Sequence, residues 1–141
     1  MNRRVKVLLA KLGLDVHNRG VITVAMELRD KGMEVIYLGN SLPDEILATA
    51  VQEQVDVIGV SSLGGAHLSL GSLLLHKAEQ TDLKDEFVFL IGGVFSPEDA
   101  EELLSLGFDD VFPPGATQDT IVSGLQKALA EKKGGGIEIE E

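Results

Sequence analysis

Residues 5–20 read VKVLLAKLGLDVHNRG, and they contain the first copy of the pattern that decides the fold. The apolar-rich run Val5–Ala10 predicts a strand, the polar residues after it predict a loop, and apolar residues at helical spacing predict a helix over Gly20–Lys31. Strand, loop and helix follow one another in this order five times along the chain. The regular alternation, with short connections, predicts a parallel sheet covered by helices on both faces.

The predicted strands are mostly continuous apolar runs, which is typical of strands buried on both faces. They are Val5–Ala10, Val35–Leu38, Val57–Ser61, Phe87–Ile91 and Asp110–Phe112. The helices predicted between and after them are Gly20–Lys31, Asp44–Gln54, His67–Gln80, Pro97–Leu106 and Gln118–Glu131. Together they predict a flavodoxin-like (Rossmann-like) α/β fold with a five-stranded parallel sheet in the order 2-1-3-4-5. Residues 1–133 would form one domain, followed by a flexible acidic tail at 134–141 that begins with three glycines.

The fourth helix has the clearest end signals. Ser96 is a preferred N-cap residue and Pro97 suits the first helical position. Glu98 and Asp99 would lie near the positive end of the helix dipole, and Gly107 suits the exit. The sequence therefore predicts both ends of this helix.

The composition excludes several classes of function. Of the 141 residues, 44% are hydrophobic and 25% are charged, a balance typical of one globular domain. No apolar run reaches the roughly 18 residues that cross a bilayer, and the first residues lack a signal-peptide pattern, so we expect a cytoplasmic protein with no membrane partner. The lack of cysteine excludes disulfides, thiolate metal sites and thiol nucleophiles. A net charge of −11 argues against a nucleic-acid partner and against a site for coenzyme A phosphates on this chain.

A candidate metal-binding pair follows the first strand. In a sheet of this order, ligands bind outside the carboxyl ends of the strands, where the strand order reverses between strands one and three. Asp15 and His17 lie two residues apart in the loop at that point, so the carboxylate can reach one ring nitrogen of the histidine. Such a carboxylate fixes the tautomer of a metal-binding histidine and makes its other nitrogen more basic. Gly20 leaves room for a large flat ligand at the helix start. The alternative is that Asp15 and His17 are simply solvated and bind no ligand.

Small residues also follow the third and fourth strands. Residues 61–67 read SSLGGAH, and the pair Gly92-Gly93 follows Ile91. Each glycine pair alone is compatible with a tight turn. With the segment after the first strand, which ends in Gly20, three neighbouring strand ends carry glycine. We expect such ends to form a slot for a long, thin part of a ligand.

These motifs, taken in order, resemble the signature of base-off/His-on cobalamin-binding domains. The set is Asp15-x-His17-x-x-Gly20, then Ser61-x-Leu63 after 40 residues, then Gly92-Gly93 after 28 more. The resemblance extends from about Arg4 to Ala130. Within that family, four segments look most similar to acyl-CoA mutases such as methylmalonyl-CoA mutase: Val5–Gly20, Val60–His67, Ile91–Pro97 and Val111–Ala116. In its extent, limited to the cobalamin domain, the chain resembles the separate small subunits of methylmalonyl-, isobutyryl- and 2-hydroxyisobutyryl-CoA mutases.

The resemblance implies a role for each position of the motif. His17 would be the lower axial ligand of cobalt, in place of the cofactor's own dimethylbenzimidazole, and Asp15 would hydrogen-bond to it. Ser61 and Leu63 would line the slot for the displaced nucleotide tail, with the glycine pair on its other side. The neighbouring residues expected to contact the cofactor are Asn18, Arg19, Gly20, Gly64, Gly65, His67, Gly92 and Gly93.

Two positions depart from the mutase pattern. Val16 stands where the mutases often have glycine, and Asn18 where they often have aspartate. Neither change removes a ligand, but Val16 puts in doubt how the loop rearranges around the corrin. His67 matches a histidine often found at this position, which leaves a corrin contact and a partner contact open. Arg19 would touch the cofactor or a partner, or be solvated.

The resemblance implies that the chain is the cobalamin-binding subunit of an adenosylcobalamin-dependent acyl-CoA mutase. The cofactor, a cobalt corrinoid, would supply the radical chemistry of a carbon-skeleton rearrangement, and no catalytic residue is expected on this chain beyond the cofactor. A separate barrel-type large subunit would bind the acyl-CoA, so the chain alone would be inactive.

Three alternatives share parts of the pattern. The small subunit of glutamate mutase is one, but Gly64-Gly65-Ala66-His67 fits the acyl-CoA mutases better. A corrinoid methyl-transfer protein usually has a helical cap domain, which is not expected in the 14 residues before Asp15. A receiver-like signalling domain needs an aspartate after strand three and a lysine after strand five, where this chain has Ser61-Ser62 and Pro113-Pro114-Gly115.

Two further residues are expected to have ordinary structural roles. His76 is predicted to be a surface or half-buried residue of the third helix. Tyr37, the only tyrosine, is predicted to end the second strand and to serve in packing.

Overall fold

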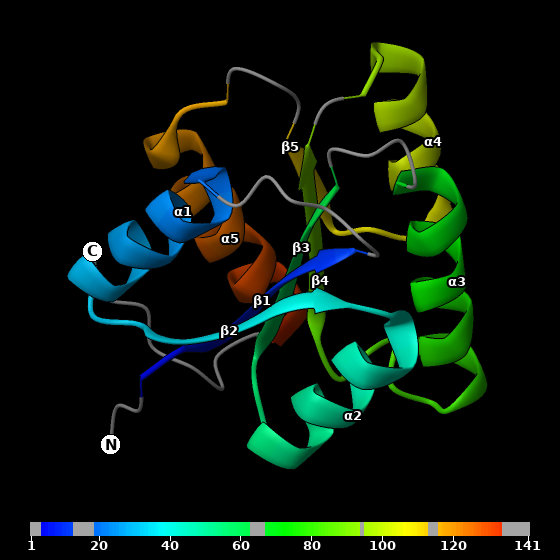
Figure 1. Cartoon of the computed structure of the whole chain (residues 1–141), viewed down its shortest axis with the longest axis horizontal. Helices are drawn as coiled ribbons and strands as arrows, with labels where there is room; N and C mark the ends of the chain where they lie inside the picture. The colour runs from blue at the N-terminus through cyan, green and yellow to red at the C-terminus, as the bar shows by residue number, and fades with distance from the viewer. Residues whose placement is uncertain (1–3, 13–18, 63–66, 94, 113–115, 134–141) are drawn as a thin grey trace.

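The computed structural model describes residues 4–12, 19–62, 67–93, 95–112 and 116–133. Its five strands are β1 (Lys6–Leu12), β2 (Glu34–Ser41), β3 (Val57–Ser62), β4 (Val88–Gly93) and β5 (Asp110–Phe112). Its five helices are α1 (Arg19–Asp30), α2 (Pro43–Glu53), α3 (His67–Gln80), α4 (Pro97–Leu106) and α5 (Gln118–Lys133). All paired strands are parallel, and the sheet order is β2-β1-β3-β4-β5 (Figure 1). The predicted fold class and strand order are confirmed.

The helices cover both faces of the sheet, as the alternating pattern predicts. In Figure 1, α1 and α5 lie on one side of the sheet, and α2, α3 and α4 lie on the other. Side chains of β1 divide between two cores because successive residues of a strand point to opposite faces. Val7 and Leu9 pack with α1 and α5, whereas Leu8 and Ala10 pack with the helices of the opposite face. The continuous apolar runs in the sequence therefore serve two cores at once.

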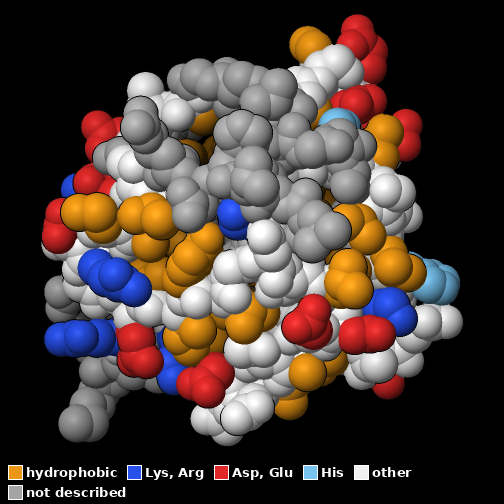
Figure 2. All heavy atoms as spheres, in the orientation of Figure 1, with side chains coloured by type: hydrophobic (Ala, Val, Ile, Leu, Met, Phe, Trp, Pro, Cys, Tyr) orange, Lys and Arg blue, Asp and Glu red, His pale blue; other side chains and the backbone are white. Residues whose placement is uncertain are grey.

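Strand β2 departs from the sequence expectation in length and burial. It extends beyond Val35–Leu38 at both ends, so Tyr37 does not end it, and the Tyr37 residue is 37% exposed. Most residues of β2 are half-buried or exposed, because β2 is an edge strand that pairs only with β1. Figure 2 shows apolar side chains interspersed with charged ones on the face drawn there.

The pairing of β1 with β2 contains one irregularity. Leu9 pairs with Tyr37 but Ala10 pairs with Gly39, so Leu38 is an extra residue in β2. Gly39 has a φ of +84°, and no atom lies within 4 Å of the position that a Cβ would take. Glycine is therefore favoured at this position by the backbone conformation and not by lack of space.

The ends of α4 agree with the sequence signals. The Ser96 hydroxyl accepts a hydrogen bond from the Asp99 backbone N–H at 3.1 Å, and Pro97 is the first helical residue. Gly107 ends the helix with a φ of +124°. The other helices begin and end within two residues of the predicted positions.

Aspartate side chains connect neighbouring strands at the amino edge of the sheet. The carboxylate of Asp56, a residue that is 2% exposed, accepts a hydrogen bond from the Lys6 backbone N–H at 2.9 Å. The Asp109 carboxylate accepts one from the Phe89 backbone N–H at 2.8 Å. These carboxylates bind backbone donors at the starts of β1 and β4, where strand pairing begins.

Replacing Asp56 should test the first of these connections. Asp56→Ala should lower the free energy of unfolding by about 1.5–3 kcal/mol, because a hydrogen bond to a charged acceptor is lost and the Lys6 N–H loses that partner. Urea denaturation followed by circular dichroism measures the change. Asp44→Ala is the matched control, since Asp44 forms an exposed ion pair with Lys77 at 3.0 Å and should cost about 1 kcal/mol or less. Equal losses in the two variants would contradict the role given to Asp56.

Candidate functional site

The carboxyl ends of the three central strands lie side by side at one edge of the sheet. Lys11 of β1 is in register with Ser61 of β3, which is in register with Gly92 of β4. Ser62 and Gly93 form the next pair. The strand order reverses between β1 and β3, where β1 continues toward α1 on one face and β3 toward α3 on the other (Figure 1). Ser61 and the glycine pair therefore lie together at this edge, and their role in a ligand slot stays a prediction.

Several predicted site residues lie outside the described part of the chain. Residues 13–18, which include Asp15, His17 and Asn18, connect the end of β1 to α1. Residues 63–66, which include Leu63, Gly64 and Gly65, connect β3 to α3. Arg19 and Gly20 are the first residues of α1. The roles given to all of these residues stay predictions.

Gly93 is required by the close approach of β4 to β3. A Cβ at Gly93 would lie 2.0 Å from the Ser62 carbonyl oxygen, and its φ is +154°. Backbone atoms therefore occupy the space that a side chain would need. Gly92 differs, because the nearest atom to its Cβ position is the Phe112 carbonyl oxygen at 3.5 Å, an ordinary contact. Of the two glycines, only Gly92 leaves room for a substituent.

His67, at the first position of α3, is buried and paired with a carboxylate. Its Nε2 lies 2.7 Å from Oδ2 of Asp99 in α4, and its ring centroid lies 5.3 Å from that of Phe95. Because an ionised carboxylate can only accept, Nε2 carries the hydrogen, and in a neutral ring Nδ1 is then an acceptor. The residue is 7% exposed, so its burial removes it from the surface that a partner would touch. His76, by contrast, is exposed as expected.

Two buried polar atoms near this edge lack a hydrogen-bond partner among the described residues. They are Oγ of Ser62, at the end of β3, and Nδ1 of His67, at the start of α3. An unsatisfied buried polar group costs about 1–3 kcal/mol, so such atoms are rare unless a ligand or water binds them. These two atoms lie on either side of residues 63–66 in the chain. They give the edge binding capacity for a polar ligand.

The sequence reasoning missed three residues of this region. The sequence connects Asp99 only to the helix dipole, because no local spacing relates it to a histidine 32 positions earlier. Ser62 is only the variable residue between Ser61 and Leu63 in the motif. Lys11 is 4% exposed and lies next to Ser61 in the sheet. A single lysine near the end of an apolar strand, at the predicted ligand edge, is a sequence signal that makes Lys11 a candidate for this site.

Comparison with known proteins identifies the family. Residues 5–122 match the B12 binding domain family. The chain is 44% identical over 129 residues to the 2-hydroxyisobutanoyl-CoA mutase small subunit of Aquincola tertiaricarbonis, covering 91% of this chain and 94% of that protein. It is 37% identical over 136 residues to the pivalyl-CoA mutase small subunit of Xanthobacter autotrophicus, covering 92% and 90%. It is 34% identical over 128 residues to the methylmalonyl-CoA mutase large subunit of Propionibacterium freudenreichii, covering 90% of this chain but 17% of that protein.

Solved structures agree on the fold. A cobalamin-binding protein from Desulfitobacterium hafniense superposes with a TM-score of 0.77 at 21% identity, covering 89% of this chain and 60% of that one. The signal receiver domain of a Luxo repressor protein from Vibrio parahaemolyticus superposes with a TM-score of 0.73 at 16% identity, covering 93% and 94%. Identities this low show a shared fold and nothing about function. It is the sequence matches that show the family: the chain belongs to the B12-binding domain family, in the group that includes the small subunits of acyl-CoA mutases.

Proposed function

We propose that this chain binds adenosylcobalamin and acts as the cobalamin-binding small subunit of an acyl-CoA mutase. The observation that carries the proposal is the extent of the sequence matches. Relatives named as small subunits align over nearly their whole length, whereas the large-subunit relative aligns over less than a fifth of its length. Residues 1–133 would be the cobalamin-binding domain, with a tail at 134–141.

The described residues at the carboxyl edge fit a large polar cofactor. Ser62 Oγ and His67 Nδ1 are buried atoms that can bind polar ligand groups. A Cβ at Gly92 would make only ordinary contacts with Phe112, so the end of β4 is not closed off by backbone at this position as it is at Gly93. Asp99 holds the His67 ring through Nε2 and leaves Nδ1 available. Ser61, in register with Gly92, would line the nucleotide slot together with Leu63.

The residues that would hold the cobalt belong to the connection between β1 and α1. His17 would hold the cobalt through one ring nitrogen, and Asp15 would fix the tautomer and orientation of His17 through the other ring nitrogen. When bound, adenosylcobalamin supplies the radical chemistry of the rearrangement. This chain's own residues bind the cofactor, orient it and help to keep water away from it.

The acyl-CoA would bind to a separate large subunit of barrel type. A net charge of −11 on this chain repels the coenzyme A phosphates. A cofactor at an open sheet edge also needs a second protein surface to exclude water. Asn18 and Arg19, next to the predicted ligand, are the proposed contacts with that surface.

Both subunits are expected in the cytoplasm. Among the described residues, no helix is both long enough and apolar enough to cross a bilayer.

Replacing His17 should remove the cobalt ligand without unfolding the chain. The purified chain should bind cobalamin base-off, and the Co(II) form should give an electron paramagnetic resonance spectrum split by one histidine nitrogen. His17→Ala should abolish that splitting. Asp15→Asn should keep it while weakening binding about 10–100-fold, the usual effect of losing a partner of a metal ligand. Splitting that survives His17→Ala would overturn the ligand assignment.

The glycine pair should respond unequally to substitution. Gly92→Val should keep the fold, since its Cβ position makes an ordinary contact, but should weaken binding of cobalamin by filling the slot. Gly93→Ala should lower the free energy of unfolding by about 3 kcal/mol or more, because the added Cβ collides with the Ser62 backbone. Isothermal titration and urea denaturation measure the two effects. Cobinamide, which lacks the nucleotide tail, is the control ligand. If Gly92→Val weakens both ligands equally, the slot lies elsewhere.

Mutase activity should require the second subunit. The chain loaded with adenosylcobalamin should not turn over acyl-CoA thioesters alone, and activity should appear when a large acyl-CoA-binding subunit is added. Gas chromatography of the hydrolysed acyl products measures the rearrangement. Size-exclusion chromatography with and without the cofactor measures the assembly. Turnover by the isolated loaded chain would contradict the two-subunit proposal.

A further inference from the structure

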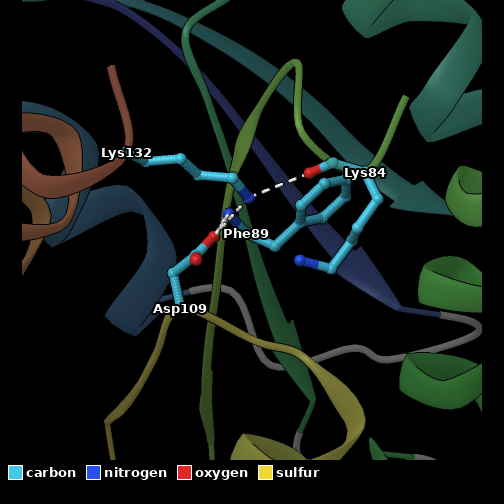
Figure 3. Close-up of polar contacts among 4 residues, drawn as sticks. All are labelled: Lys84, Phe89, Asp109 and Lys132. Carbon is cyan, nitrogen blue, oxygen red and sulfur yellow. Dashed lines mark hydrogen bonds and ion pairs between the residues drawn. The ribbon is translucent and has the colours of Figure 1, made fainter. Parts of the chain in front are cut away.

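Two lysines and a phenylalanine meet at the amino edge of the sheet, opposite the candidate site. Figure 3 shows Lys84, Phe89, Asp109 and Lys132 pointing toward one another from the loop after α3, from β4, from the loop before β5 and from α5. The Lys132 ammonium donates to the Lys84 carbonyl oxygen at 2.9 Å and to Asp109 Oδ2 at 3.0 Å. The same Asp109 oxygen accepts the Phe89 N–H at 2.8 Å. Lys132 is therefore held by two acceptors.

The side-chain nitrogen of Lys84 lies in the same cluster, but no acceptor among the described residues hydrogen-bonds to it. It lies 5.3 Å from the centroid of the Phe89 ring, and the Lys132 nitrogen lies 5.5 Å from the same centroid. No hydrogen-bond acceptor contacts the Lys84 nitrogen among the described residues, and no dashed line reaches it in Figure 3. A Cβ at Gly107 would lie 3.1 Å from Lys84 Cε, so the lysine stem occupies space that this glycine leaves open.

These surroundings disfavour the charged form of Lys84. Burial lowers the pKa of Lys84 below its ordinary value of 10.5, and the charge and hydrogen bonding of Lys132 lower it further. Asp109 and Asp85 act in the opposite direction without cancelling the effect. At a pH well below the ordinary and the lowered pKa of a lysine, each unit by which the pKa falls raises the unprotonated fraction of that lysine about tenfold. A lysine that is desolvated and next to another cation is the usual form of an activated amine nucleophile.

We infer that Lys84 is a modification site that reacts with acyl thioesters to form an acyl-lysine. The unprotonated Nζ attacks the thioester carbonyl carbon, the carbon–sulfur bond breaks, and the thiolate leaves. The nitrogen then loses one proton, which the thiolate takes up, so the products are an amide and a thiol. The reaction needs no oxidant, reductant or metal.

The same geometry selects Lys84 over its neighbour and favours the product. Both lysines are half-buried, but Lys132 is held by two acceptors, whereas Lys84 has none among the described residues. Acylation removes a positive charge that is repelled by the neighbouring Lys132. The inference is independent of the proposed function, because it concerns the opposite edge of the sheet and requires only a thioester.

Mass spectrometry of the full chain tests this site. The chain is incubated with S-acetyl-N-acetylcysteamine, a neutral acyl thioester, between pH 7 and pH 10, and acetylation is quantified at each lysine. Lys84 should react at least about threefold faster than Lys31 and Lys127 at pH 7.5, and its rate should level off at a lower pH. Both comparison lysines are exposed. A Lys84 rate equal to or below theirs overturns the inference.

Two variants examine the cause. Lys84→Arg should remove the modification while leaving acetylation at Lys31 and Lys127 unchanged. Lys132→Gln removes the neighbouring charge, so it should slow acetylation of Lys84 at pH 7.5 and move its pH profile upward. Circular dichroism confirms that each variant is folded. An unchanged or faster rate at Lys84 in folded Lys132→Gln would overturn the activation by Lys132.

Discussion

The parallel direction of all paired strands is the constraint on which the rest of the structure depends. Parallel neighbours cannot be joined by tight turns, so the chain must return across one face of the sheet through a helix each time. The returns divide between the two faces, which gives β1 and β4 apolar neighbours on both sides. The same constraint brings every carboxyl end to one edge, so that segments far apart in the sequence meet there. The candidate cofactor site is thus a product of strand direction as well as of the residues that line it.

Most of the fold could be predicted from the sequence because the pattern of apolar runs repeats at regular intervals. The cap at Ser96 and the helix ends are local features, the strand order follows from the regular alternation of strands and helices, and the structure has all of them. The exposure of β2 is not a local feature, because its apolar run resembles those of the central strands and only its place at the edge of the sheet exposes it. The full length of β2 could not be predicted either, because no sequence signal marks the extra residue at Leu38.

The candidate site was predictable to a different extent. Motif spacing identified Ser61 and the glycine pair, and strand register brings them together. Spacing could not reveal that Asp99 holds His67, nor that Gly93 is needed for the contact with the Ser62 backbone, because both depend on tertiary distances. The similarity to a receiver domain shows that whole proteins can also have the same fold without having the same site. Two chains can share this sheet while the residues at its carboxyl edge give them unrelated chemistry.

The core that β1 and α5 share has a consequence for the order in which the chain can fold. Val5 and Val7 near the beginning of the chain share one core with Leu125 and Leu129 near its end. During synthesis the central strand therefore leaves the ribosome long before the helix that completes its core. Contacts of such high sequence separation slow folding and leave apolar surface exposed until late translation. Until α5 has left the ribosomal exit tunnel, Val5 and Val7 lack the apolar partners that this helix supplies.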